Sequence, residues 1–393
     1  MNTGDSNSNS NASASANANA NRIADAVDTA TTVQDRLVAR YLQPYSVTLV
    51  YLAFSFVFLY LGLQKVVPHR STADVQLATI GGLLGLPYVP FVTFVGLWQL
   101  TIGGLFLLRR LRLCAWFFFS YQVFTFGTLI VLRRIVFQPP WLSVAGMELP
   151  WALGAYAAFI LKNLGFAAIF FVLASCEFDT DDAPGAADAG SKPKPPSEDS
   201  TAGGRTLRAL RSRLGGVVER GHAAQNHLVA NYFRPHGVTI TYWSYGFIWF
   251  YFGLQKPAAV YSPVRNPLAD FLPEFAIPVA AGMAFIGTYE MFLGLLFFFR
   301  EIRAAFPFFL AHQAVTFLTL VVIPFVAFQP PWIPLFGVSV PWALTGFGAF
   351  VVKNVVFVAG FVLLASVELG TLDAGRPART GRTESEATAA ADD

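Results

Sequence analysis

The chain carries one apolar unit twice. Tyr60–Lys65 reads YLGLQK and Tyr251–Lys256 reads YFGLQK, while the string FQPPW begins at Phe137 and again at Phe328. The same offset of 191 residues relates every such pair, and about 50 of the roughly 140 positions aligned between 38–178 and 229–369 are identical. Self-similarity at one fixed offset indicates an internal duplication. We therefore expect two tandem copies of a single folding unit.

Each copy contains four apolar stretches of about 20 residues, the length that crosses a bilayer as a helix. The expected spans are 47–66, 86–108, 113–135 and 150–175 in the first copy, and 238–257, 277–299, 305–327 and 341–366 in the second. An even number of spans lets both copies enter the membrane from the same side, so the repeats are predicted to be parallel. The fold class predicted is an all-α integral membrane protein with eight transmembrane helices as two tandem four-helix repeats.

Composition supports this class. Only 13% of the residues are charged and 54% are hydrophobic, whereas a soluble protein carries about 25% charged residues. This composition excludes a soluble enzyme and a disordered regulator. The net charge of +3 is too small to indicate a polyanionic partner, so no nucleic acid is expected. The expected partner is the lipid bilayer.

The chain divides by composition into five segments. Residues 1–45 form a disordered or interfacial N-terminal tail that begins with 20 low-complexity residues, 46–177 the first membrane repeat, 178–235 a linker, 236–369 the second repeat and 370–393 a C-terminal tail. Residues 1–20, the C-terminal tail and the first part of the linker read as disordered, and a short amphipathic helix is expected from about 23 to 41. The rest of the linker reads as a basic amphipathic helix, either on the membrane surface or solvated.

Basic residues predict the orientation. With the N-terminus inside, the cytoplasmic segments hold 19 of the Lys and Arg residues and the outer segments hold 6. Because cytoplasmic loops carry the excess of Lys and Arg, both termini are predicted to be cytoplasmic, in a multi-pass protein of the cell membrane.

Redox centres find little support in the sequence. The two cysteines, Cys114 and Cys176, form no CxxC pair and are too few for an iron–sulfur cluster. His312 is the only histidine within an expected span, so a haem with two histidine ligands is not expected. No metal or cofactor site is evident.

The polar residues within the spans are the candidate site. Glu290 lies twelve residues after Pro278, and Lys353 lies twelve after Pro341. At 1.5 Å per residue both would lie about 18 Å deep, so an ion pair between them is expected. The candidate intramembrane site is Glu290, Lys353, Asn354, His312, Gln313 and Thr316. Polar residues also hold membrane helices together, and this structural role stays open.

The first copy holds a diverged counterpart of this layer. Its residues are Gln99, Lys162, Asn163 and Gln122. Gln99 replaces Glu290, and Tyr121 replaces His312, so the second copy is expected to keep the ancestral site. Lys65 and Lys256 end the first span of each copy, either as interface anchors or at the outer mouth of a site. The Pro-Trp elements between the third and fourth spans are expected to end helices at the headgroup level.

The pattern resembles the DoxX-like four-helix membrane proteins, closest to the YkgB-type (DUF417) group, as a tandem duplication. The second copy carries the resemblance in a set of short motifs: Gly253 with Lys256, Tyr261-Ser262-Pro263, Asn266-Pro267-Leu268, Glu290 with Gly294, Pro331-Trp332 and Phe350 with Lys353-Asn354. The first copy lacks the Ser-Pro loop and departs at Gln99.

The resemblance implies an accessory or quinone-associated subunit of a membrane redox system, not catalytic by itself, with a membrane oxidoreductase as partner. Single-copy relatives would dimerise, so the two repeats are expected to form a pseudo-dimer. Two alternatives stay open: a small-solute or proton-coupled transporter that uses Glu290, His312 and Lys353, and a structural membrane scaffold.

Overall fold

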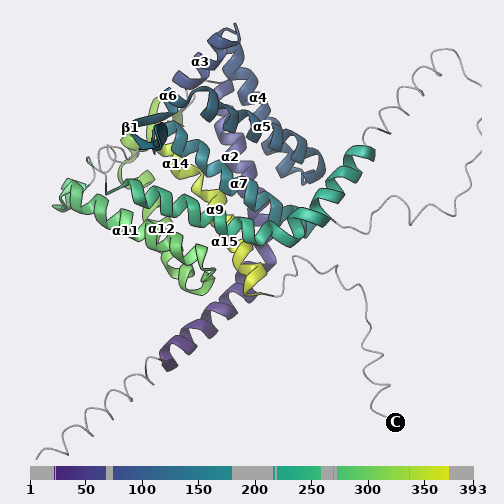
Figure 1. Ribbon diagram of the computed structural model, residues 1–393, viewed down its shortest axis with the longest axis vertical. Helices are drawn as coiled ribbons and strands as arrows, with labels where there is room; N and C mark the ends of the chain where they lie inside the picture. The colour runs from purple at the N-terminus through teal and green to yellow at the C-terminus, as the bar shows by residue number, and fades with distance from the viewer. Residues whose placement is uncertain are drawn as a thin grey trace, which may run out of the picture.

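The structure is a computed structural model, and it describes residues 22, 24–67, 74–178, 216, 219–257, 269, 272–335 and 337–370 (Figure 1). Residues 1–21 and 23 of the predicted N-terminal tail, residues 371–393 of the C-terminal tail, the first part of the linker and the Ser-Pro loop at 261–268 lie outside the described residues. The basic amphipathic helix predicted in the linker is described only as a helix over 219–228 that leads into the second half.

Long apolar helices make up the body of the molecule. Their bounds are α2 (Ser46–Val66), α4 (Tyr88–Leu107), α5 (Leu111–Val131), α7 (Ala155–Glu177), α9 (Arg234–Gln255), α11 (Val279–Phe298), α12 (Ile302–Val322), α14 (Gly346–Val352) and α15 (Asn354–Glu368). Among the described residues, seven stretches are long and apolar enough to cross a membrane: Ala24–Val66, Tyr88–Leu107, Leu111–Val131, Tyr156–Glu177, Val279–Phe298, Ile302–Val322 and Gly346–Glu368. The expectation of a multi-pass membrane architecture built on helical spans is confirmed at this level. The 22-residue α9 is not among the seven, and it begins with Arg234, Pro235 and His236.

Short elements connect the long ones. They are the π-helices η1 (Val38–Leu42) and η3 (Val229–Phe233), the 3-10 helices η2 (Gln43–Tyr45) and η4 (Leu272–Phe275), and the α-helices α3 (Asp74–Leu83), α6 (Arg133–Val136) and α13 (Pro324–Ala327). The helix over 24–37 continues through η1 and η2 into α2, and Figure 1 shows it projecting from the body.

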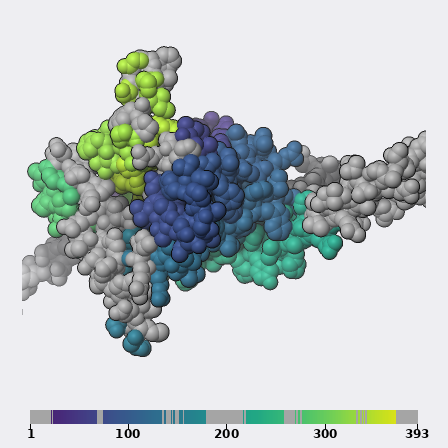
Figure 2. Space-filling model, turned by 90° about the horizontal axis from the view of Figure 1, so that it is seen from above, coloured from purple at the N-terminus to yellow at the C-terminus, as the bar shows by residue number. Residues whose placement is uncertain are grey.

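Two β-hairpins stand where helices were expected to begin. β1 (Phe137–Val144) pairs with β2 (Met147–Leu153), and β3 (Phe328–Leu335) pairs with β4 (Val338–Leu344), both antiparallel. Ala145 and Gly146 have φ of 50° and 77°, as a two-residue hairpin turn with two left-handed positions requires. Figure 2 shows the yellow-green chain near position 330 projecting from the body.

The hairpins correct two predictions. Spans predicted to start at 150 and 341 begin instead at Ala155 and Gly346. The Pro-Trp elements were expected to end helices, but they lie inside strands. Proline is compatible with these strands, because both strands of a two-stranded ribbon are edge strands. Pro278, by contrast, is the N-cap of α11, as expected.

Tight turns join α4 to α5 and α11 to α12. Arg109 and Arg300 are in the left-handed conformation, with φ of 52° and 60°. The next amide in each turn completes a Schellman cap: Arg110 N donates to Leu105 O at 2.9 Å, and Glu301 N donates to Leu296 O at 2.8 Å. These short turns keep each helix pair antiparallel and adjacent.

Four helices form the centre of the bundle. α7 packs against α9 and α15, and α15 packs against α2, so elements of the N-terminal and C-terminal halves alternate there. α4 and α5 cover one side and α11 and α12 the other (Figure 1). Within each half, glycines allow the first two long helices to approach closely. A Cβ on Gly253 of α9 would lie 2.5 Å from Met291 N and 2.6 Å from Gly287 O of α11.

Arginines gather at the end of the bundle opposite the hairpins. Arg303 pairs with Asp35 at 3.0 Å, Arg300 pairs with Glu368 at 2.8 Å, and Arg112 Nη1 donates to Asn226 Oδ1 at 2.7 Å. This is the end that the distribution of basic residues assigns to the cytoplasm.

Candidate functional site

Glu290 of α11 is the buried carboxylate at the centre of the candidate site. Its side chain is 6% exposed, and Lys256 Nζ, at the end of α9, donates to its Oε2. Its other oxygen, Oε1, lies 3.2 Å from His312 Nε2 of α12. Three helices therefore bring an ammonium, a carboxylate and an imidazole into one chain of contacts, and the close approach of α9 and α11 at Gly253 places Lys256 within reach.

Aromatic rings hold the imidazole of His312 between α9 and α11. The ring meets Trp249 edge-on at 4.7 Å between centroids and stacks on Tyr289 at 6.0 Å. On its other side, Nδ1 lies 3.4 Å from both Thr316 Oγ1 and Gln313 Nε2. One ring nitrogen thus faces the Glu290 carboxylate and the other faces neutral polar side chains. His312 therefore connects Glu290 of α11 to Gln313 and Thr316 of α12.

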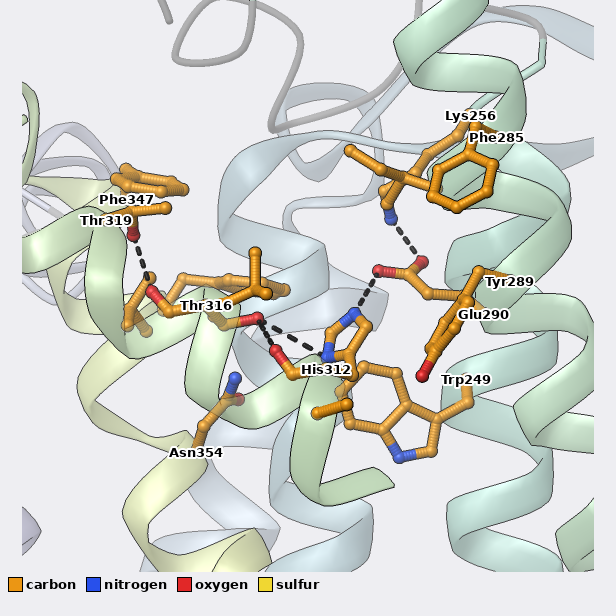
Figure 3. A pocket seen from close by; sticks show the side chains of 15 residues that line it. Trp249, Lys256, Phe285, Tyr289, Glu290, His312, Thr316, Thr319, Phe347 and Asn354 are labelled. Carbon is orange, nitrogen blue, oxygen red and sulfur yellow. Dashed lines mark hydrogen bonds and ion pairs between the residues drawn. The ribbon is translucent and has the colours of Figure 1, made fainter. Parts of the chain in front are cut away.

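A pocket of about 260 Å³ opens beside these residues. Its walls come from α9, α11, α12, α14 and the start of α15, and they are mostly apolar. The lining residues are Trp249, Lys256, Phe285, Ile286, Tyr289, Glu290, Ala311, His312, Val315, Thr316, Thr319, Phe347, Phe350, Val351 and Asn354. Figure 3 shows Lys256, Glu290 and His312 joined in a line, with Thr316 and Asn354 on the other side of His312.

The pocket reaches the outside of the bundle through apolar side chains. Phe285 is 71% exposed and Val315 is 63% exposed, although both also line the pocket. They belong to α11 and α12, two of the helices apolar enough to cross a membrane. A ligand that dissolves in hydrocarbon would meet this face first and the buried polar groups afterwards.

Lys353 does not pair with Glu290, so that expected ion pair is wrong. Its Nζ donates to Phe159 O at 2.8 Å and to Asn163 Oδ1 at 2.6 Å, both on α7. Because its helix begins at Gly346 and not at Pro341, Lys353 lies only about 10 Å along it, and its side chain faces the other half. Lys256, expected at an outer mouth or as an anchor, is buried and takes the place of Lys353 beside Glu290.

Lys162 makes the reciprocal contact from α7. Its Nζ donates to Phe350 O at 2.8 Å and to Asn354 Oδ1, and it lies 3.3 Å from the centre of the Phe350 ring. Lys353 lies 3.4 Å from the Phe159 ring in the same way. Each lysine thus crosses to the opposite half and meets a carbonyl, an asparagine and an aromatic ring. Within the described chain, neither amine contacts a carboxylate.

The counterpart layer of the first half is bonded differently. Gln99 Nε2 donates to Tyr121 Oη at 2.6 Å, Lys65 Nζ donates to Leu61 O at 3.2 Å, and the Gln122 amide nitrogen is buried without a partner in the described structure. Tyr121 and Trp98 pack edge to face at 5.7 Å. The layer is therefore neutral where the second half has Glu290 and His312, as the residue types indicate.

The site brings together five of the predicted residues and adds several that sequence reasoning missed. Glu290, His312, Thr316, Asn354 and Lys256 line the pocket. The missed members are mainly aromatic: Trp249, Phe285, Tyr289, Phe347 and Phe350. Helical spacing was the available signal. Trp249 lies seven residues before Lys256, and Phe285 lies four residues before Tyr289, which directly precedes Glu290.

The chemistry of these groups is hydrogen bonding and proton exchange. In the part of the chain that the structure describes, no group of three or more His, Cys, Asp or Glu side chains is placed to hold a metal ion. Mostly apolar walls with a few convergent polar groups are typical of small-molecule sites. No protein-family model, curated protein or solved structure matches this chain.

Proposed function

We propose that the protein binds a lipid-soluble, ring-shaped molecule of the quinone class in the pocket of the second half, as an accessory subunit of a membrane redox system. The observation that carries the proposal is the combination of an apolar mouth at Phe285 and Val315 with a buried Lys256–Glu290–His312 end. A quinone ring fits aromatic walls, and its oxygens need the hydrogen-bonding groups that the inner end supplies.

The eight-helix arrangement belongs to the same proposal. We assign α9 as a further span, because its 22 residues run in the centre of the bundle between α7 and α11. The two halves then form a pseudo-dimer of parallel repeats. The reciprocal contacts of Lys162 and Lys353 support it, as do those of Tyr60 on Trp342 O at 2.6 Å and of Tyr251 on Trp151 O.

The relationship to DoxX-like proteins, the cell-membrane location and the cytoplasmic termini complete the proposal. Glu290 and Lys256, which belong to two motifs of the suggested resemblance, contact each other directly. This ion pair would explain why both motifs occur together. The hairpins lie at the end that the proposal places outside, and the arginine-rich end faces the cytoplasm.

Binding of decylubiquinone to the purified protein in lipid nanodiscs tests the ligand class. Trp249 lines the pocket, so bound quinone quenches its fluorescence. We expect quenching that saturates at one quinone per chain. Glu290→Gln keeps the shape but removes the carboxylate that orients Lys256 and His312, the two side chains that can donate to a quinone oxygen. Loss of one charge-assisted hydrogen bond from these donors, about 1.5–3 kcal/mol, weakens binding about tenfold or more.

Gln99→Ala is the matched control for this experiment. It changes the equivalent position of the first half, where Gln99 bonds Tyr121, and should leave binding unaltered. Quenching that rises linearly with quinone concentration, or that is the same in Glu290→Gln, contradicts the proposed function.

A proton-coupled carrier is the second candidate. It is favoured by the run of contacts from Glu290 through His312 to Thr316 and on to Thr319, whose hydroxyl donates to Thr316 O at 2.6 Å. A carrier predicts proton movement in liposomes that contain the protein and a pH-sensitive dye, and this movement disappears in His312→Phe. A quinone-binding subunit alone gives no proton movement in this assay.

A further inference from the structure

Asn354 presents an unused hydrogen-bond donor to the pocket. The residue is 1% exposed, and its oxygen is held by Lys162 Nζ. An ammonium has donors only, so the atom that it meets must be the amide oxygen, and the amide nitrogen must turn the other way. Figure 3 shows that nitrogen directed at the pocket below Thr316.

The equivalent asparagine of the first half has no such free group. Asn163 Nδ2 donates to Thr125 Oγ1 at 3.3 Å, while its oxygen accepts from Lys353. Thr316, the counterpart of Thr125, donates instead to His312 O at 2.8 Å. Among the described residues, none accepts a hydrogen bond from Asn354 Nδ2. A ligand acceptor in the pocket would give Asn354 Nδ2 the hydrogen bond that the described residues do not supply.

We propose that Lys162 of the first half is a positioning residue for the ligand pocket of the second half. It fixes the Asn354 amide so that Nδ2 donates to a carbonyl oxygen of the ligand. Lys162 also holds Phe350 O, so it fixes two wall residues at once. The inference rests on the proposed function and narrows the ligand to a ring that carries a second carbonyl on the side opposite its contact with Lys256 and His312.

The pair of lysines supplies the test with its own control. Lys162→Met releases Asn354 and Phe350, which line the pocket, whereas Lys353→Met releases Asn163 and Phe159, which do not. Both variants remove one buried amine that meets a carbonyl, an asparagine and an aromatic ring of the other half. We expect Lys162→Met to weaken decylubiquinone binding in nanodiscs about fivefold to tenfold, and Lys353→Met to leave it unchanged.

A second pair of variants keeps the inference testable if either lysine variant fails to fold. Asn354→Asp keeps an oxygen for Lys162 but turns an acceptor toward the pocket in place of the donor. The variant should lose affinity for decylubiquinone and gain affinity for its quinol form, whose hydroxyls donate. Asn163→Asp makes the same change facing Thr125 and should alter neither affinity.

The outcomes separate the two proposals. If the wild-type protein shows no saturable quinone binding, the proposed function fails. The positioning role of Lys162 is overturned if the wild-type protein binds quinone but Lys162→Met and Lys353→Met have the same affinity for decylubiquinone. It is also overturned if Asn354→Asp has the same preference between quinone and quinol as the wild-type protein. An inverted preference in Asn354→Asp alone supports it, because a purely structural role would lower both affinities together.

Discussion

The contact between Lys256 and Glu290 predicts a specific thermodynamic coupling. The two side chains are 7% and 6% exposed, so removal of either partner leaves a poorly solvated charge. Loss of one partner of a buried pair costs about 3–5 kcal/mol. We expect the lower end, about 3 kcal/mol, for Lys256→Met, because Glu290 keeps its contact with His312.

The other corners of the cycle follow from the same geometry. Glu290→Gln should cost less, about 2 kcal/mol, because Lys256 ends its helix and its long side chain can extend toward the interface. The double variant removes both charges, and its cost should stay near 3 kcal/mol. A coupling of about 2 kcal/mol results, within the range measured for residues in contact.

Reversible unfolding in mixed micelles of dodecyl maltoside and SDS, followed by circular dichroism, measures this coupling. The control cycle is Lys65→Met with Gln99→Leu, since Lys65 bonds Leu61 O and Gln99 bonds Tyr121 in the first half. The control coupling should be below about 0.5 kcal/mol. Equal couplings in the two cycles, or a value under 0.5 kcal/mol for Lys256 and Glu290, would refute the reasoning.

The remaining predictions concern packing and topology. Gly253→Ala should destabilise the protein by about 1–3 kcal/mol in the same unfolding assay, because the new methyl meets α11 backbone, while Gly104→Ala, with nothing within 4 Å, should not destabilise it; equal losses would contradict the close-approach argument. Gln255→Ala should cost about 0.5–1.5 kcal/mol, because Leu153 N loses the Gln255 oxygen while Trp151 O keeps its bond from Tyr251; an unchanged midpoint would contradict this. In a cysteine-free background, Ser339→Cys should react with an impermeant maleimide added outside cells and Thr32→Cys should not; the reverse pattern would overturn the orientation.

Residue types and helical spacing were sufficient to predict much of the site. His312 and Thr316 lie four residues apart on α12, so they necessarily share a face, and the replacement of Glu290 by Gln99 marked the second half as the place of the charged layer. The long apolar helices were predictable for the same reason, because hydropathy and length alone identify a membrane span.

The partners of the lysines were not predictable in this way. Depth counted from Pro341 placed Lys353 level with Glu290, but β4 extends to Leu344 and shifts the start of the helix. The direction of each lysine depends on how α7 and α15 pack across the two halves, which spacing within one helix does not specify. Lys162 bonds Asn354 of the other half and Lys353 bonds Asn163, and this reciprocal pairing can be recognised only from the three-dimensional packing of the helices.

Quinone binding at the pocket is the central claim, and photolabelling tests it most directly. An azido derivative of decylubiquinone, activated in nanodiscs and mapped by mass spectrometry, should label peptides of α11 and α12 around Phe285 and Val315. Unlabelled decylubiquinone should compete this labelling away in wild-type protein, and Glu290→Gln should reduce it. Labelling spread evenly over both halves, insensitive to competitor and to Glu290→Gln, would contradict the account.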